Sequence, residues 1–413
     1  MSDLFEKEFQ TNAYLVSKDA KGKVRCVRLW YEWSDSAHAY LIKRQSWQLN
    51  GKRLDHPDIP IKKGLVSRTL REQTQLQFNS KLKEYKDKGY KEVEEDPDNE
   101  DEKIILNFLP EYNTDSYNHI KPMLAKQEKK VIKREIFDNE WLASRKINGL
   151  RCCFYWDGKH IKTYSRGGEN YDLSTQHLTK HPILIEIFKK FPTLILDSEL
   201  YKHGKSLQQI SGAARLERNA VDCDWLEIYC YDCFFTNKMG VPAKQRELFL
   251  IKLFKSYNIY GFNPIREWQQ GELQIQLVPQ VKVSGWENIE KLHNKYVSEG
   301  FEGVVLRDPD KPYKPNSRGN QMIKVKHYLD ATYKVIDYEL GLRGSEDMTF
   351  ILQMPNGKTF KASPMGDRAI KADYVENFDK KYKNHLGDCK YFEISDSGIP
   401  CQPKFTVFRF DLE

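Results

Sequence analysis

The stretch SRKINGLRC, residues 144–152, decides how this sequence is interpreted. Strand-like residues flank it on both sides, and Gly149 permits a tight turn that would present Lys146. A lysine attacks phosphorus only when its amine is unprotonated, and nearby cations at Arg145 and Arg151 would lower the lysine pKa. In isolation the segment is also typical of an ordinary surface turn, so its meaning depends on the charged residues that follow it.

Charged side chains stand on or beside three apolar strands downstream. LDSEL places Asp197 and Glu199 at i and i+2, hence on one face of a strand, and Glu302 directly precedes the strand GVVLRD. MIKVKHY places Lys324 and Lys326 on one face of another strand. Carboxylates can hold Mg²⁺ and sugar hydroxyls, and lysines can neutralise a triphosphate. A lysine nucleophile with these partners supplies what nucleotidyl transfer needs.

In this order, the segments resemble the motifs of covalent nucleotidyltransferases, and within them the ATP-dependent DNA ligases, over residues 118–413. KINGLR resembles motif I (K-x-D-G-x-R), YSRGG the S-R-x-G element that follows it, and LDSEL motif III. IYCYDCFF resembles motif IIIa, EGVVLR motif IV, IKVK motif V and PKFTVFRFD motif VI. KPMLAK, residues 121–126, resembles the segment that precedes motif I in DNA ligases.

The resemblance implies a role for each matching residue. Lys146 would be the catalytic nucleophile and would carry AMP as a phosphoramidate. The implied nucleotide-binding residues are Arg151, Arg166, Glu199, Tyr231, Glu302, Lys324, Lys326 and Arg409. Tyr231 would stack on adenine, and Glu199 and Glu302 would hold the metal, Mg²⁺ or Mn²⁺, with Glu199 also able to bind the ribose. The two motif V lysines would contact the α-phosphate, the first two arginines the sugar or nick phosphates, and Arg409 the leaving pyrophosphate.

Three positions depart from the family pattern. Asn148 stands where aspartate is common, and it keeps the hydrogen-bonding oxygen but not the charge. Ser144 stands where an acidic residue often reads the adenine amino group, which leaves the base preference open. Leu412 replaces the lysine of R-x-D-K, so only Arg409 and Asp411 of that motif remain.

The implied reaction is ATP-dependent sealing of nicks in duplex DNA in three metal-dependent steps, by a monomer with nicked duplex DNA as its partner. RNA ligases and mRNA capping enzymes share motifs I to V, although the segment before motif I and motif VI favour a DNA ligase. A non-catalytic DNA-binding protein with a ligase-like core is the alternative from another class, and the intact Lys146, Glu302, Lys324 and Lys326 argue against it. Covalent labelling by ATP or GTP would separate these possibilities.

The expected fold class is α+β with three parts. Residues 1–91 read as a small β-rich domain with one long helix, and residues 92–117 as an acidic linker. Residues 118–329 are expected to form an ATP-grasp-like nucleotidyltransferase domain of antiparallel sheets and helices. Residues 330–413 contain short strands separated by glycine-containing turns, which favours an OB-fold barrel.

The N-terminal part has two aromatic-rich strands, VRCVRLWYEW and AYLIKRQSWQL, before its helix. The expected helix ends at Gly89 and has an apolar face formed by Leu70, Leu76, Phe78, Leu82 and Tyr85. This arrangement resembles a WGR-type domain, a module associated with recognition of DNA ends. A stabilising addition without a DNA-binding role is the alternative.

Charge and composition bound the remaining classes. The net charge is +7, and it rises to +15 when the eight acids between Glu92 and Glu102 are set aside, which suits a polyanionic partner. No run of eighteen apolar residues and no secretory h-region is present, so we expect a cytoplasmic or nuclear protein of cellular or viral origin, without a membrane contact. Cys230 and Cys233 lie in a β-prone apolar run with no second pair to complete a zinc site, which favours buried strand cysteines.

Overall fold

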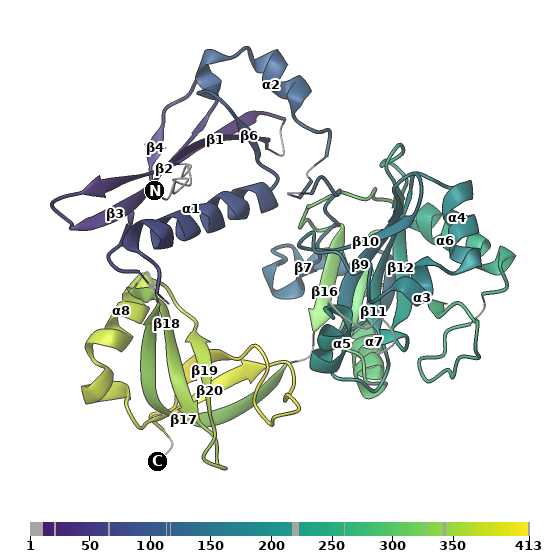
Figure 1. Cartoon of the computed structure of the whole chain (residues 1–413). Coiled ribbons are helices and arrows are strands. Elements are labelled where there is room, and N and C mark those ends of the chain that lie inside the picture. Colours follow the sequence, from purple (N-terminus) through teal and green to yellow (C-terminus); the bar gives the residue numbers. More distant parts are fainter. Residues whose placement is uncertain are drawn as a thin grey trace, which may run out of the picture. The chain divides into compact units, whose positions relative to one another are not determined.

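The computed structural model describes residues 11–19, 22–64, 67–112, 114–115, 117–216, 223–259, 261–326, 328–341 and 344–411 (Figure 1). The chain divides into two compact units. The first contains Met1–Leu124 with two short segments, Tyr164–Asn170 and Lys314–Arg318. The second contains the remaining residues, including both sheets of the predicted nucleotidyltransferase domain and the C-terminal barrel. Within the described ranges, no helix is long and apolar enough to span a membrane.

The first unit is built on one sheet, ordered β4-β3-β2-β1-β6 with β5 paired to β3. Its strands are β1 (Asn12–Lys18), β2 (Val24–Ser34), β3 (Ala39–Gln48), β4 (Leu54–Asp55), β5 (Ile59–Ile61) and β6 (Lys91–Val93). The helix α1 (Leu70–Asp87) begins at a Thr69 capping box and buries Phe78, Leu82 and Tyr85 against the sheet. The predicted strands and helix are confirmed, but Leu76 is wrong as a core residue because it is 45% exposed.

The prediction of a solvated acidic linker over residues 92–117 is wrong, because much of this segment is folded onto the first sheet. The helix α2 (Glu102–Phe108) follows a 3₁₀ turn at Pro97–Asn99, and Ile105 packs with Trp47 and neighbouring apolar residues of the sheet. Asp96 and Asp98 each accept a hydrogen bond from Arg53 at 2.7 Å. Composition counts the acids of a segment but does not show which of them find a distant cation.

The second unit contains two five-stranded sheets, ordered β10-β9-β11-β12-β13 and β14-β8-β15-β16-β7. The β9–β11, β11–β12, β8–β14, β8–β15 and β15–β16 pairs are antiparallel, whereas the β12–β13 and β16–β7 pairs are parallel. The first sheet contains β9 (Leu150–Trp156), β10 (Ile161–Ser165), β11 (Leu194–Tyr201), β12 (Glu227–Phe235) and β13 (Ile275–Leu277). The second contains β7 (Lys126–Gln127), β8 (Trp141–Lys146), β14 (Gln280–Val283), β15 (Gly303–Arg307) and β16 (Met322–Lys326).

Helices accompany these sheets along the chain, and the two sheets share one apolar core. They are α3 (Gln176–Thr179), α4 (Pro182–Lys190), α5 (Leu207–Ala214), α6 (Ala243–Ser256) and α7 (Trp286–Ser298). Strands β11 and β12 are buried along almost their whole length, since side chains on both of their faces are covered. Cys230 and Cys233 are buried in β12, as the sequence predicts for strand cysteines.

The C-terminal strands close into a barrel in the order β17-β18-β19-β21-β20, with β17 also paired to β20. They are β17 (Leu329–Gly341), β18 (Gly344–Gln353), β19 (Thr359–Pro364), β20 (Leu386–Tyr391) and β21 (Lys404–Phe408), and helix α8 (Arg368–Glu376) follows β19. The barrel core includes Val335, Phe350, Leu352 and Phe405. Leu412, which departs from motif VI, lies outside the described residues.

Candidate active site

Lys146 ends β8, at a point where three strands approach each other closely. It lies opposite Gly303 of β15, and its carbonyl accepts the Glu302 amide at 2.9 Å. A Cβ on Gly303 would stand 2.3 Å from the carbonyl oxygen of Val325 on β16, so only glycine fits there. A Cβ on Gly149 would meet the Leu200 carbonyl oxygen at 2.4 Å. The two glycines therefore let the Lys146 turn lie against both sheets.

The Lys146 ammonium and the Lys326 ammonium share one carboxylate, that of Glu302. Burial raises the pKa of Glu302, but the charges and hydrogen bonds of the two lysines lower it by more. The resulting pKa of Glu302 is below the ordinary value. The pKa of Lys326 is lowered by burial, and Lys146 adds to this effect, while Glu302 opposes it. Glu302 is therefore an ionised group that holds two cations together at the centre of the cluster.

Arg145 and Arg151, the cations expected to act on Lys146, each pair with a different carboxylate in the structure. Arg145 pairs with Glu299 at 2.7 Å, and its guanidinium lies 4.3 Å from the ring centroid of Tyr296. Arg151 Nε donates to Asp197 Oδ1 at 2.8 Å. Each guanidinium is thus neutralised by its own carboxylate, and the cation that shares a partner with Lys146 is Lys326.

Glu199 joins the cluster from β11, the neighbouring strand of β9. The Tyr231 hydroxyl donates to Glu199 Oε2 at 3.2 Å. Burial raises the pKa of Glu199 to about 7, although the positive charges of Lys146 and Arg151 act in the opposite direction. The nearby charge of Glu302 raises it further. A buried carboxyl group whose pKa is raised towards neutral pH beside specific charged partners is typical of functional sites.

Sequence reasoning missed a buried ionic network beneath Tyr231. Arg307 donates to Ser144 Oγ at 2.9 Å, and its guanidinium lies 5.2 Å from the centroid of the Tyr231 ring. Asp232 accepts from Arg246 at 2.8 and 3.0 Å and lies 3.3 Å from Arg307 Nε. Burial raises the pKa of Asp232, but these two arginines bring it below its ordinary value. Both Arg307 and Asp232 stand inside motif segments, which was the available signal.

Two further residues at the site come from parts of the chain without a motif. The Tyr313 hydroxyl donates to Asp197 Oδ2 at 2.6 Å, and its ring stacks on Phe234 with centroids 4.2 Å apart. Gln280 of β14 lies opposite Ser144 and donates from Nε2 to the Tyr231 carbonyl at 3.2 Å. Its Oε1 is buried and accepts no hydrogen bond from the part of the chain that the structure describes.

The three remaining predicted residues, Lys324, Arg166 and Arg409, lie in three different parts of the structure. Lys324 lies on β16 opposite Val305, on the same face as Lys326. Arg166 is exposed in the turn after β10 and belongs to the first unit. Arg409 pairs with Asp388 at 3.3 Å and with Asp411 at 2.7 Å, both residues of the C-terminal barrel segment. The cluster around Lys146 therefore holds Glu199, Glu302 and Lys326, with Arg409 engaged within the barrel.

The segment after β20 reaches the motif I turn. Asn148 Nδ2 donates to Glu393 Oε2 at 3.1 Å, and Lys326 Nζ lies 3.8 Å from the Phe392 ring centroid. Asparagine can donate a hydrogen bond to this carboxylate, whereas aspartate would place a second negative charge against it. The departure at position 148 is thus matched to its partner in the barrel segment.

Comparison with known proteins identifies relatives in the same family that the motifs of the site resemble. Residues 122–326, about half of the chain, match the ATP dependent DNA ligase domain. A DNA ligase of African swine fever virus (isolate Pig/Kenya/KEN-50/1950) is 29% identical over 308 residues, covering 70% of this chain and 68% of the viral protein. A DNA ligase of Archaeoglobus fulgidus is 28% identical over 208 residues, covering 48% of this chain and 33% of the archaeal one.

A solved structure from a study of Lig E DNA ligases has a similar fold, with a TM-score of 0.52 at 19% identity. The match covers 70% of this chain and 99% of that one. The chain belongs to the family of ATP-dependent DNA ligases. As a member of this family it is a ligase that requires ATP and, in general, a divalent metal.

Proposed function

We propose that this ligase seals 5′-phosphate/3′-hydroxyl nicks in duplex DNA through a covalent AMP on Lys146. The observation that carries the proposal is the shared Glu302 carboxylate, which holds the Lys146 ammonium beside Lys326 with Glu199 close by. One nucleophile, two carboxylates and a second lysine in one cluster are the groups that a nucleotidyl transfer requires.

The chemistry that we assign to these residues begins with the Lys146 amine. After Nζ has lost its proton, it forms a bond to the α-phosphorus of ATP, and the bond to the bridging oxygen breaks as pyrophosphate leaves. Lys324 and Lys326 balance charge on the α-phosphate, and Arg151 lies beside the sugar. AMP then passes to the 5′-phosphate of the nick, and the 3′-hydroxyl displaces it.

The carboxylates fit a metal that arrives with the nucleotide. Within the described ranges no group of three or more His, Cys, Asp or Glu side chains could hold a metal ion. Mg²⁺ is commonly held by one or two protein carboxylates together with substrate phosphates, and Glu199 and Glu302 supply such a pair. The ion would neutralise triphosphate charge, while the protein positions the amine.

Base selection in this proposal depends on Tyr231 and Gln280. Tyr231 supplies the aromatic face for adenine, and the Ser144 hydroxyl already accepts from Arg307. Gln280 is held by the Tyr231 carbonyl so that its oxygen, a hydrogen-bond acceptor, remains without a partner among the described residues. An acceptor suits the 6-amino group of adenine and disfavours the 6-oxo group of guanine.

The outer parts of the chain have roles in the same proposal. We assign residues 330–413 as an OB-fold domain, supported by the closed barrel and its strand order. Residues 118–329 would form the adenylylation domain and residues 1–91 a WGR-like accessory that contributes to DNA binding. Arg409 would reach pyrophosphate only when the barrel closes over ATP, a lid movement that must reverse before DNA binds.

The test is to incubate the purified chain with α-labelled ATP or GTP and measure acid-stable covalent label. ATP should label the wild type, whereas Lys146→Ala should remain unlabelled, because in this proposal the amine that bonds to phosphorus is that of Lys146. Lys159→Ala, at an exposed turn lysine, is the matched control and should label normally. Label on Lys146→Ala would contradict the nucleophile, and label from GTP alone would point to a capping enzyme. Sealing nicked RNA in preference to nicked DNA would support the RNA ligase alternative.

A further inference from the structure

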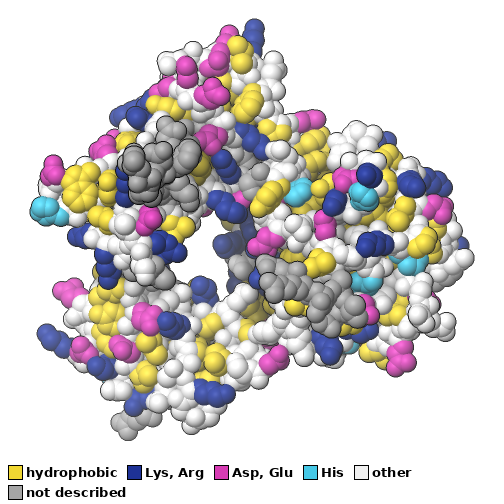
Figure 2. Space-filling model, in the orientation of Figure 1, with side chains coloured by type: hydrophobic (Ala, Val, Ile, Leu, Met, Phe, Trp, Pro, Cys, Tyr) yellow, Lys and Arg dark blue, Asp and Glu magenta, His cyan; other side chains and the backbone are white. Residues whose placement is uncertain are grey.

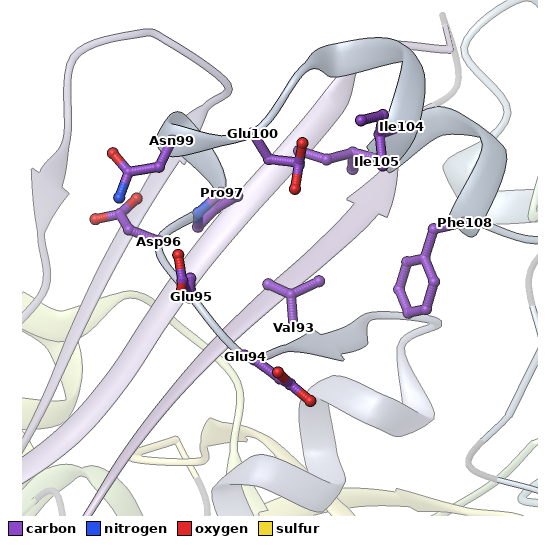
Figure 3. A pocket seen from close by; sticks show the side chains of 10 residues that line it. All are labelled: Val93, Glu94, Glu95, Asp96, Pro97, Asn99, Glu100, Ile104, Ile105 and Phe108. Atoms are coloured by element: carbon purple, nitrogen blue, oxygen red, sulfur yellow. The ribbon is translucent and has the colours of Figure 1, made fainter.

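A groove in the first unit lies outside the matched ligase domain. It has a volume of about 430 Å³ and is lined by Val93, Glu94, Glu95, Asp96, Pro97, Asn99, Glu100, Ile104, Ile105 and Phe108. Figure 3 shows α2 on one side, with Ile104 and Phe108, and the segment after β6 on the other. A groove of this size can take one or two side chains of a bound segment.

Two apolar side chains of the groove, Ile104 and Phe108, are not part of the core beneath it. Ile105 of α2 and Leu109, which directly follows the helix, already pack in that core, where they are 3% and 5% exposed. Ile104 and Phe108, four residues apart and therefore on one helix face, are 57% and 55% exposed. Two large apolar groups on a short surface helix beside a groove are typical of a contact surface.

The groove is also negatively charged. Asp96 and Asp98 both pair with Arg53, whose single positive charge balances one of the two. Glu94, Glu95 and Glu100 are exposed, and no ion pair involves them within the part of the chain that the structure describes. In Figure 2, acidic side chains lie next to hydrophobic ones at the top of the view, where Figure 1 labels α2. Uncompensated carboxylates repel the phosphates of DNA, so the enzyme's own substrate does not suit this groove.

We propose that this groove binds a peptide segment of a partner protein in which an apolar side chain is flanked by lysine or arginine. The apolar side chain would lie against Ile104 and Phe108, and the basic residues would pair with Glu94, Glu95 and Glu100. Such binding is weakened by salt, because the carboxylates are exposed. The first unit would then serve to bring the ligase to basic proteins.

The probe for a direct test is a fluorescein-labelled synthetic peptide, KRLKKFRK, titrated with the full chain and followed by fluorescence anisotropy. Charge reversal at Glu94→Lys with Glu95→Lys should weaken binding about tenfold, the effect of roughly 1.4 kcal/mol lost at the rim. Phe108→Ser should weaken probe binding by a similar factor, because it removes an apolar contact with the peptide. The Phe108 side chain is exposed, so its loss leaves the fold intact. A second peptide, KRSKKSRK, lacks the apolar groups and should bind more weakly than the first.

The matched control is Glu287→Lys with Glu290→Lys on α7, which changes the total charge equally at exposed positions outside the groove. It should leave probe affinity within about twofold, because only distant, screened charges change. Equal weakening by both charge reversals, or equal affinity for the two peptides, would overturn the proposal. A loss of duplex DNA affinity in Phe108→Ser with unchanged probe binding would instead make the groove a nucleic-acid contact. A wild-type oligomer that the same variants dissociate would assign it to a second copy of the chain.

Discussion

Replacing Glu199 with glutamine should stabilise the protein above neutral pH while removing its ability to adenylylate itself. The pKa of Glu199 is raised from 4.5 to about 7 by burial, so the folded state binds the proton more tightly than the unfolded state. Below pH 4.5 the carboxyl is protonated in both states and contributes no penalty. As pH rises towards 7, ionisation favours the unfolded state, and the stability of the wild type falls.

The size of the effect follows from the two pKa values. A change from 4.5 to about 7 corresponds to about 3 kcal/mol, at about 1.4 kcal/mol for each tenfold change in the protonation equilibrium. Glutamine cannot ionise and still accepts the Tyr231 hydrogen bond. The variant should therefore exceed the wild type in unfolding free energy by under about 1 kcal/mol at pH 5 and by about 3 kcal/mol at pH 8.

Amide hydrogen exchange in β9 and β11, corrected for intrinsic rates, is a suitable assay because it reports local unfolding in a multidomain chain. Glu290→Gln removes an equal charge at an exposed position of α7 and serves as the control. A Glu199→Gln variant that is no more protected than the wild type at pH 8, or equally more protected at both pH values, would refute the reasoning. Loss of labelling by ATP in the stabilised variant would show that the carboxylate is kept for function.

Asn148→Asp should slow nick sealing several-fold by placing a second carboxylate against Glu393, and adding Glu393→Gln should restore the rate; no recovery in sealing assays would mean that their contact is unimportant. Arg409→Ala should slow adenylylation of the enzyme about 10²-fold, the usual effect of one lost charge-stabilising donor. Sealing of a pre-adenylylated nick should be slowed much less, and an equal loss in both assays would make Arg409 a structural residue. Deleting residues 1–110, which removes α2 together with its sheet, should leave ATP labelling intact and weaken binding to nicked duplex DNA; unchanged affinity in an anisotropy titration would exclude a DNA-binding role for that region.

Local sequence was sufficient for most of the secondary structure. The alternation of aromatic and polar residues predicts β2 and β3, and the apolar spacing around Phe78 predicts α1, because such patterns reflect which side chains face a core. The motif I turn and the strand after Glu302 were predicted from local sequence as well, and the structure shows close approaches at Gly149 and Gly303. The acidic segment was misjudged, because Arg53 pairs with Asp96 and Asp98 from a distant point in the chain and Ile105 packs in a core.

By itself the sequence determined the inventory of this protein: a lysine in a tight turn, carboxylates and paired lysines on strands, and the family to which these motifs point. Only the tertiary structure decided which charges meet. Lys146 and Glu302 are 156 residues apart and share one ion pair, while Arg145 and Arg151, beside Lys146 in the chain, are directed to Glu299 and Asp197. Adjacent residues on a strand, such as Arg145 and Lys146, point to opposite faces of the sheet. Pairing between strands instead brings together residues that are far apart in the chain, such as Lys146 and Glu302. The electrostatics of the site are therefore fixed by strand register and not by the motif.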